Sequence, residues 1–279
     1  MIRAGALLLL ALLAGCATTP EALYEAADEA ARSAGMMPQR FAAPPFTLAG
    51  WLRPGTAGPL VVYIEGDGHA WTTPTQPSRD PTPHNPVALA LARLDPAPRL
   101  LYLARPCQYG GVAGDAACTV PLWTSRRFAP EVVDALGRAL DEAERACGAD
   151  RLLLVGYSGG GVVAALLAAR RTDVDGLVTL VAPLDLAAWV KAQGLTPLAG
   201  SLDPAAEVEA KGAGRLAGLP QSHIAGGKDR VVPPEVVRAF AARVGAPVRV
   251  VPGMAHDGDW PALWPALRAE LAAAVPFPR

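Results

Sequence analysis

Short apolar runs alternate with longer amphipathic stretches along most of this chain. Mostly apolar runs of about four to seven residues are typical of strands that are buried on both faces of a parallel sheet. On this basis we predict strands over residues 60–64, 100–103, 152–155, 176–182, 222–225 and 248–251. The stretches between them predict helices over residues 86–94, 130–147, 162–169, 234–244 and 261–275. This alternation predicts an α/β fold with a doubly wound, mostly parallel sheet flanked by helices.

The N-terminal part of the chain has a different pattern. Residues 21–35 predict a short helix, residues 36–45 are interpreted as a linker, and residues 46–52 predict an edge strand. The 279 residues are enough for one large α/β domain, and 51% of them are hydrophobic, which is ample for its core. We therefore assign residues 46–279 to a single domain.

The first residues carry a candidate targeting signal. Arg3 precedes an apolar run over residues 4–14, which is too short to span a bilayer but has the length of a signal-peptide core. The run leads into the sequence LAGC, which resembles a bacterial lipobox whose cysteine would be Cys16. The resemblance implies that residues 1–15 are removed, that Cys16 is lipidated on its sulfur and amine, and that Ala17 favours the outer membrane. An ordinary signal peptide, or a leader that arose by chance, followed by a buried cysteine is the alternative.

Three cysteines remain in addition to Cys16. An exported protein permits disulfides, and Cys107 and Cys118 flank a glycine-rich loop, so they are the natural pair. Closing so short a loop would stabilise the fold by about 2–3 kcal/mol in the chain-entropy model. Cys147 is expected to be a free, half-buried thiol at the end of a helix. The alternative is that all three are reduced core residues.

One strand–turn–helix unit carries candidate chemistry. The predicted strand over residues 152–155 is followed by the sequence GYSGG, whose serine is Ser158, and then by an apolar helix. This order is the pattern of a nucleophile elbow. A turn so sharp strains the serine backbone, and side chains two residues before and after it would collide, which explains Gly156 and Gly160. A glycine-rich turn with an incidental serine is the alternative.

Together with the order of the strands, this motif resembles the α/β-hydrolase family over about residues 46–275. The resemblance implies that Ser158 is the nucleophile, that Asp229 in GGKDR is the acid, and that His256 in GMAHDG is the base. His256 would take the proton of Ser158, and Asp229 would orient His256. Each of the three follows a predicted strand. Because the carboxyl ends of parallel strands share one edge of a sheet, the three side chains can converge.

Other residues compete for these roles. Asp185 ends the strand before Asp229 and is its rival as the acid, whereas a turn or helix-capping role is the non-catalytic alternative for Asp229. Asp257 is expected to be a turn residue or the cap of the last helix. A satisfied surface or core position is the alternative for His256, as it is for the remaining histidines. These are His69, His84 and His223.

Acyl transfer also requires donors that point at the oxyanion. The resemblance implies that one donor is the backbone N–H of Gly159, directly after the serine. The second should come from the loop after the strand at residues 60–64, with the N–H of Asp67 as first choice and that of Gly68 as second. Relatives commonly have His-Gly at the start of this loop, so the chain departs from the family pattern at Glu65.

The sequence gives little support to metals, cofactors or nucleic acids. Glu65, Asp67 and His69 could suggest a metal site, but neighbouring oxygen ligands without a second cluster are weak evidence, so no metal is assigned. An acyl-enzyme mechanism needs no cofactor. The formal net charge of −1 does not favour a nucleic-acid partner.

These observations predict an esterase-like serine hydrolase that acts on a small acyl substrate. Residues 16–45 would link its lipid anchor to the domain, on the periplasmic side of the outer membrane. Residues 186–220, with apolar side chains such as Trp189 and Leu195, are expected to form a cap that selects an apolar acyl group, or else to fill the core. The alternatives in function are a non-catalytic envelope lipoprotein and an acyltransferase with the same three residues.

Overall fold

The computed structural model describes residues 19–110 and 114–278 of the chain. The predicted signal peptide and Cys16 therefore lie outside the described residues. Among the helices that are described, none has both the length and the apolar character needed to cross a membrane.

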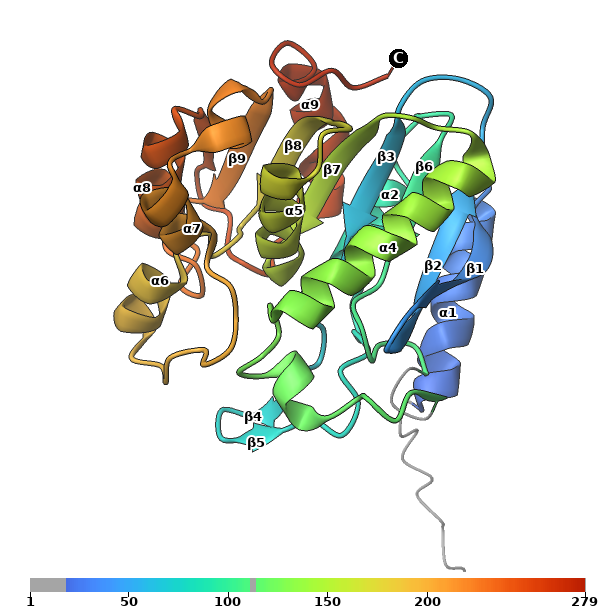
Figure 1. Cartoon of the computed structure of the whole chain (residues 1–279), viewed down its shortest axis with the longest axis horizontal. Helices are drawn as coiled ribbons and strands as arrows, with labels where there is room; N and C mark the ends of the chain where they lie inside the picture. Colours follow the sequence, from blue (N-terminus) through green and yellow to red (C-terminus); the bar gives the residue numbers. More distant parts are fainter. Residues whose placement is uncertain (1–18, 111–113, 279) are drawn as a thin grey trace, which may run out of the picture.

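The described chain is built on one eight-stranded sheet in the order β1-β2-β6-β3-β7-β8-β9-β10 (Figure 1). Neighbouring strands from β6 to β10 are parallel, whereas β1 and β2 run antiparallel at one edge. The strands of this sheet are β1 (Met37–Ala43), β2 (Phe46–Arg53), β3 (Leu60–Ile64), β6 (Leu100–Leu103), β7 (Leu152–Tyr157), β8 (Val174–Leu180), β9 (Gln221–Gly226) and β10 (Val248–Val251). A separate hairpin consists of β4 (Trp71–Thr73) and β5 (Gln76–Pro77).

Helices cover both faces of the sheet (Figure 1). Helices α4, α5 and α8 contribute to the hydrophobic cluster on one face, and α1, α2 and α9 contribute to the cluster on the other. The helices are α1 (Pro20–Ser33), α2 (Val87–Ala92), α4 (Pro130–Cys147), α5 (Gly159–Arg170), α6 (Leu186–Gln193), α7 (Pro204–Lys211), α8 (Pro234–Val244) and α9 (Trp260–Leu271), with short 3-10 turns η1 (Val120–Trp123) and η2 (Gly214–Gly218). The predicted α/β fold with a mostly parallel sheet is confirmed.

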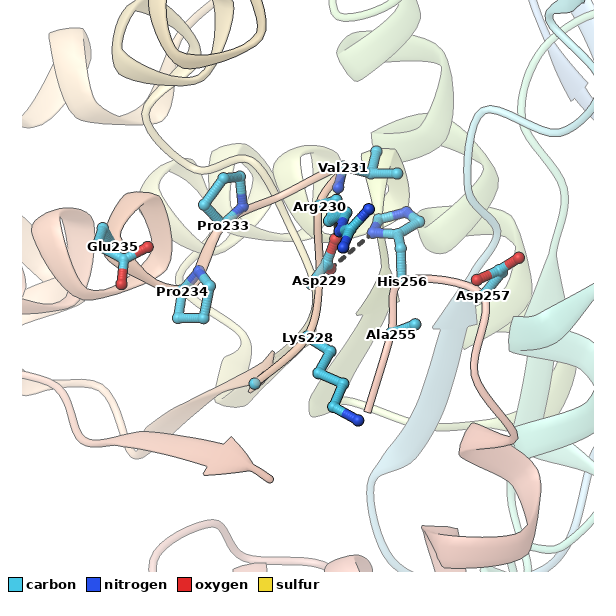
Figure 2. A pocket seen from close by; sticks show the side chains of 11 residues that line it. Lys228, Asp229, Arg230, Val231, Pro233, Pro234, Glu235, Ala255, His256 and Asp257 are labelled. Atoms are coloured by element: carbon cyan, nitrogen blue, oxygen red, sulfur yellow. Dashed lines mark hydrogen bonds and ion pairs between the residues drawn. The ribbon is translucent and has the colours of Figure 1, made fainter. Parts of the chain in front are cut away.

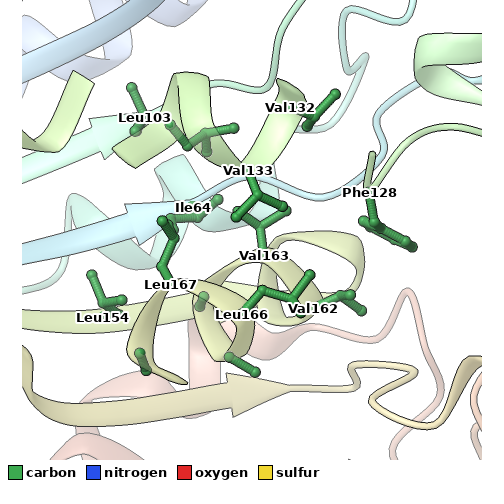
Figure 3. Close-up of a cluster of buried hydrophobic side chains, with 14 of the residues drawn as sticks. Ile64, Leu103, Phe128, Val132, Val133, Leu154, Val162, Val163, Leu166 and Leu167 are labelled. Carbon is green, nitrogen blue, oxygen red and sulfur yellow. The ribbon is translucent and has the colours of Figure 1, made fainter. Parts of the chain in front are cut away.

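The central strands show why their sequences are continuously apolar. Along β7, Leu152 and Leu154 point into the cluster of α4 and α5, whereas Leu153 and Val155 point into the cluster of the opposite face. Because successive side chains of a strand alternate between faces, a strand covered on both sides must be apolar at every position. Figure 3 shows the first of these clusters, in which Val163 of α5 packs between strand and helix side chains.

The predicted linker over residues 36–45 is wrong, because residues 37–43 form strand β1. This strand pairs with β2 along its whole length and buries Phe41 and Ala43. Its remaining side chains are mostly exposed, since it lies at the edge of the sheet. Only two buried side chains mark the strand, so its sequence lacks the continuous apolar run that identifies the central strands.

The structure contains the predicted disulfide between Cys107 and Cys118, which are 11 residues apart. The bridge ties together the two ends of the loop that follows β6. Cys147 is a free cysteine, as predicted, but it is buried rather than half-buried.

Candidate functional site

Ser158 lies at the tight turn between β7 and α5, at the carboxyl edge of the sheet. Its backbone has φ 50° and ψ −122°, a conformation that non-glycine residues rarely adopt. Two hydrogen bonds hold this strained turn: the N–H of Ser158 donates to the carbonyl of Leu180, and its carbonyl accepts from the N–H of Gly161. The neighbouring strand and the new helix therefore fix the position of the serine hydroxyl.

The glycines around Ser158 allow a close approach of three backbone segments. A methyl group at Gly156 would overlap the backbone of α5. A methyl group at Gly160 would overlap the carbonyl oxygens of Ile64 and Glu65, at the end of β3. As expected from the sequence, a larger side chain would collide at either position. Because glycine has no side chain, the loop after β3 can lie directly against the turn.

The structure brings Ser158, His256 and Asp229 together in one hydrogen-bonded row. His256 Nε2 lies 3.0 Å from Ser158 Oγ, and His256 Nδ1 lies 2.9 Å from Asp229 Oδ2. Figure 2 shows the second of these contacts beside a pocket between the loops that follow β9 and β10. This arrangement leaves Nε2 free to accept the serine proton when Nδ1 donates to the carboxylate.

The carboxylate of Asp229 is fully buried and is fixed by its own loop. Its Oδ1 accepts hydrogen bonds from the N–H groups of Val231 and Val232, at 2.8 and 2.7 Å. Helix α6 holds this loop from outside, because Trp189 Nε1 and Gln193 Nε2 donate to carbonyls of the same loop. The Asp229 carboxylate therefore has little freedom to rotate, and its Oδ2 stays directed at His256.

Two aromatic side chains hold the backbone of His256. The hydroxyl of Tyr157 and the indole N–H of Trp260 both donate to the carbonyl of His256, at 3.1 and 3.0 Å. Tyr157 immediately precedes Ser158, so the serine turn and the histidine loop are tied to each other. The sequence does not predict this role for either aromatic residue, because no motif marks a side chain that acts through a backbone carbonyl.

Asp185, the rival acid, lies elsewhere. Its Oδ1 accepts from the N–H of Ala188 and caps α6, and its Oδ2 pairs with Arg243 at 3.0 Å. Of the two roles expected for Asp257, the structure shows the turn, whereas Asp259 caps the last helix by accepting from the first turn of α9. Asp257 is exposed and lies beside the serine.

The other histidines have different surroundings. His223 is buried in β9 with its Nδ1 2.8 Å from Thr179 Oγ1, and burial lowers its pKa to about 4. His69 and His84 stack on each other with ring centroids 4.3 Å apart. Burial also lowers the pKa of His69, and the neighbouring His84 lowers it further.

The two predicted oxyanion donors lie on the segments that meet at the serine. Gly159 begins α5, and Asp67 follows Gly66, whose added methyl group would lie 3.5 Å from the Cβ of Ser158. Among the described residues, the backbone N–H groups of Asp67 and Gly159 have no hydrogen-bond acceptor. Two free N–H groups beside a serine hydroxyl are what a developing oxyanion would require.

Glu65 is buried directly beneath this loop. Its carboxylate accepts hydrogen bonds from the N–H of Gly66 at 2.8 Å and from the hydroxyl of Tyr102 at 3.0 Å. Desolvation raises the pKa of Glu65 to about 7, although these hydrogen bonds oppose the shift. The Glu65 carboxylate is therefore held by hydrogen bonds at the base of this loop, although Glu65 also contributes to the hollow beside Ser158.

A hollow of about 310 Å³ opens above Ser158 and is lined mainly by polar residues. The residues in addition to Ser158 are Glu65, Gly66, Asp67, Gly68, His69, Pro83, His84, Asn85, Val87, Tyr157, His256 and Asp257. None of them comes from residues 186–220, so the segment predicted as a cap does not line this hollow. Trp189 of that segment is instead buried in the core, while Leu195 is exposed to solvent.

Comparisons with known proteins bear on the fold. No protein-family model matches the sequence, and no curated protein matches it significantly. The structure is similar to an esterase from Pyrococcus furiosus, with a TM-score of 0.62 and 14% identity over 88% of this chain and 95% of that chain. It is also similar to an alpha-beta serine hydrolase homologue from Coxiella burnetii, with a TM-score of 0.54 and 18% identity over 85% of this chain and 95% of that one.

A third similar structure is a puromycin-hydrolysing peptidase from Mycobacterium tuberculosis. Its TM-score is 0.57 at 19% identity, over 87% of this chain and 40% of that chain. At such low identities the likeness concerns the fold, and the chain has the α/β-hydrolase fold that the sequence motifs indicated.

The buried carboxyl group of Glu65 gives a prediction about pH and stability. Because the folded state raises its pKa, its contribution to stability is fully present below pH 4.5 and is lost as the pH rises through about 7. Relative to wild type, Glu65→Gln should therefore gain up to about 3 kcal/mol of unfolding free energy between pH 4.5 and pH 8. Urea unfolding of both proteins at the two pH values measures this change.

Glu25→Gln, at an exposed position of α1, is the matched control and should differ from wild type equally at both pH values. If Glu65→Gln also showed a constant difference, the carboxyl group at position 65 would not be held by burial as described.

Proposed function

We propose that this chain is a serine hydrolase that forms an acyl-enzyme on Ser158. The observation that supports the proposal most directly is the continuous row from Ser158 Oγ through His256 to the buried Asp229 carboxylate, with contacts of 3.0 and 2.9 Å. A serine hydroxyl is a weak nucleophile unless a base within hydrogen-bond reach takes its proton. The strained turn and the two free N–H groups supply the other parts that such a reaction requires.

In the proposed reaction, Ser158 Oγ attacks the acyl carbon while its proton passes to His256 Nε2. The N–H groups of Gly159 and Asp67 donate to the oxyanion of the tetrahedral intermediate. The intermediate then breaks its bond to the leaving group, which takes the proton from His256. Water, deprotonated by His256, then attacks the acyl carbon. The bond to Ser158 Oγ breaks, His256 returns the proton to Oγ, and the acid is released. Asp229 stabilises the imidazolium in both halves of the reaction.

The hollow above Ser158 supports a compact, polar substrate rather than a long acyl chain. Ligand pockets for apolar groups are usually lined by hydrophobic side chains, whereas this one presents His69, His84, Asn85 and Asp257. Its volume of about 310 Å³ is at the lower end of the usual range. We therefore propose short-chain or hydroxylated carboxylic esters as the substrate class.

We also propose that the enzyme is a lipoprotein of the bacterial envelope, anchored through Cys16. The lipobox-like LAGC sequence supports this. Helix α1 begins four residues after Cys16, with Thr19 as its N-cap, and buries Ala27 and Ala31 against the domain. A tether this short would keep the domain close to the bilayer, since an extended residue spans at most about 3.6 Å.

A fluorophosphonate probe tests the proposed nucleophile. The probe should label the wild-type protein and Ser33→Ala, a control at an exposed serine of α1, but not Ser158→Ala.

Asp229→Asn should lower kcat by about 10⁴-fold, because the imidazole would lose its correct tautomer. Asp185→Asn should lower stability through the loss of its Arg243 pair and keep the rate per labelled serine.

Persistent labelling of a folded Ser158→Ala protein would contradict the proposal. A larger loss of kcat in Asp185→Asn than in Asp229→Asn would show that the acid has been assigned wrongly.

A series of p-nitrophenyl esters tests the proposed substrate class. From acetate to octanoate, kcat/KM should fall severalfold, because a hollow of about 310 Å³ has little room for a longer acyl chain. In an apolar acyl site each buried methylene would instead contribute about 0.8 kcal/mol. A steady rise of kcat/KM with chain length would exclude the proposed preference and point to an apolar site outside this hollow.

Replacement of the candidate lipidated cysteine tests the anchor. Cys16→Ser, expressed with its native leader in a bacterial host, should move from the membrane fraction to the soluble fraction. Cys147→Ser, at the buried free thiol, should remain with the membranes. Retention of Cys16→Ser in the membrane fraction would mean that lipid on this residue is not the anchor.

A further inference from the structure

Two buried arginines hold the carboxylate of Asp67, the residue whose N–H is the proposed second oxyanion donor. Arg127 Nη1 lies 2.6 Å from Asp67 Oδ2, and Arg105 Nη1 lies 3.3 Å from Asp67 Oδ1. The arginine side chains are only 10% and 5% exposed, so water screens these ion pairs much less than pairs at the surface.

The Asp67 carboxylate also touches the other proposed donor. A methyl group at Gly159 would overlap Asp67 Oδ1, so the carboxylate lies directly against the first residue of α5. The side chain of Asp67 therefore sets how closely its own backbone can approach that of Gly159. Rotation of this side chain would remove that contact.

Charge gives a second reason for the two arginines. An unpaired carboxylate beside a developing oxyanion would raise the energy of the transition state, because like charges repel at short range. One carboxylate and two guanidinium groups together carry a net charge of +1. The two guanidinium groups therefore offset the negative charge that Asp67 alone would place beside the oxyanion.

The two arginines are themselves fixed by the surrounding backbone. Arg127 Nε donates to the carbonyl of Thr124 at 2.6 Å, and Arg105 Nη2 donates to the carbonyl of Arg127. Gln108 connects the segment of Arg105 to the loop, since its Oε1 accepts from the N–H of Arg105 and its Nε2 donates to the carbonyl of Gly66 at 3.1 Å. Cys107, beside Gln108, carries the disulfide that closes this segment.

We infer that Arg105 and Arg127 are positioning residues for the oxyanion hole: through the Asp67 carboxylate they hold the N–H groups of Asp67 and Gly159 toward one point and cancel the negative charge there. This inference rests on the proposed hydrolase function. Neither arginine lines the hollow above Ser158, so both act through Asp67 rather than on the substrate.

Arg127→Gln tests the inference, with Arg126→Gln as the matched control. Arg126 is the adjacent residue, and its side chain is 50% exposed in a surface pair with Glu131. Arg127→Gln should lower kcat per labelled Ser158 by about 10- to 100-fold with little change in KM, since complete removal of one oxyanion donor costs about 10²- to 10³-fold. Arg126→Gln should keep the wild-type kcat.

Three further measurements separate positioning from a structural role. Arg127→Lys should recover part of the lost kcat, because it keeps the charge without the planar fork. Asp67→Asn combined with Arg127→Gln should lose little more than the worse single variant, as expected for residues that act through one contact. A boronic acid, whose tetrahedral adduct with Ser158 resembles the intermediate, should bind more weakly to Arg127→Gln in proportion to its kcat/KM.

Two results would overturn the inference and are distinguishable from each other. If Arg127→Gln unfolds more easily but its kcat per labelled serine equals that of wild type, the arginine has only a structural role, while the labelling still supports the hydrolase. If the wild-type protein is not labelled, the proposed function and this inference fail together. If Arg127→Gln does not fold, kcat per labelled serine is measured for Arg127→Lys and Asp67→Asn instead. A wild-type value in both variants would overturn the inference, and a lower value would support it.

Discussion

The candidate site depends on one close contact, in which the first turn of α5 lies against the carboxyl end of β3. Gly160 permits it, because any side chain there would overlap the carbonyls of Ile64 and Glu65. This contact places the serine turn beside the loop that carries Asp67. It also requires Ser158 to adopt φ 50°, a conformation that costs about 1–3 kcal/mol. The hydrogen bonds of Ser158 with β8 and α5 offset this cost.

The order of the strands does not by itself decide which acid contacts the histidine. Strand β8 lies between β7 and β9, so Asp185, after β8, follows the immediate neighbour of the serine strand. Asp185 nevertheless caps α6 and pairs with Arg243, and α6 in turn holds the loop of Asp229 through Trp189. The rival acid thus contributes indirectly: it begins the helix that keeps the more distant carboxylate facing His256.

The sequence was sufficient to predict the central sheet and the meeting of Ser158, Asp229 and His256, because continuous apolar strands and a motif order leave local signals. It was not sufficient for β1, where two buried residues in a seven-residue edge strand give no clear periodicity. The contacts of Asp67 with Arg105 and Arg127 span 38 and 60 residues, and no spacing rule connects positions so far apart. The apolar cap over residues 186–220 was predicted from composition. Composition does not show whether apolar side chains of such a segment face a pocket or the core, where Trp189 lies.

The loop after β3 carries two acids beneath a place where negative charge would develop, and the fold treats each of them differently. Glu65 turns into the protein, where desolvation raises its pKa to about 7 and hydrogen bonds from Gly66 and Tyr102 hold it. Asp67 stays at the surface of the hollow, where two arginines outweigh its charge. Because the oxyanion donors are backbone groups, the loop can accept acidic side chains as long as neither carboxylate faces the substrate unpaired. The departure of this chain from the family pattern is therefore compatible with the geometry that the pattern serves.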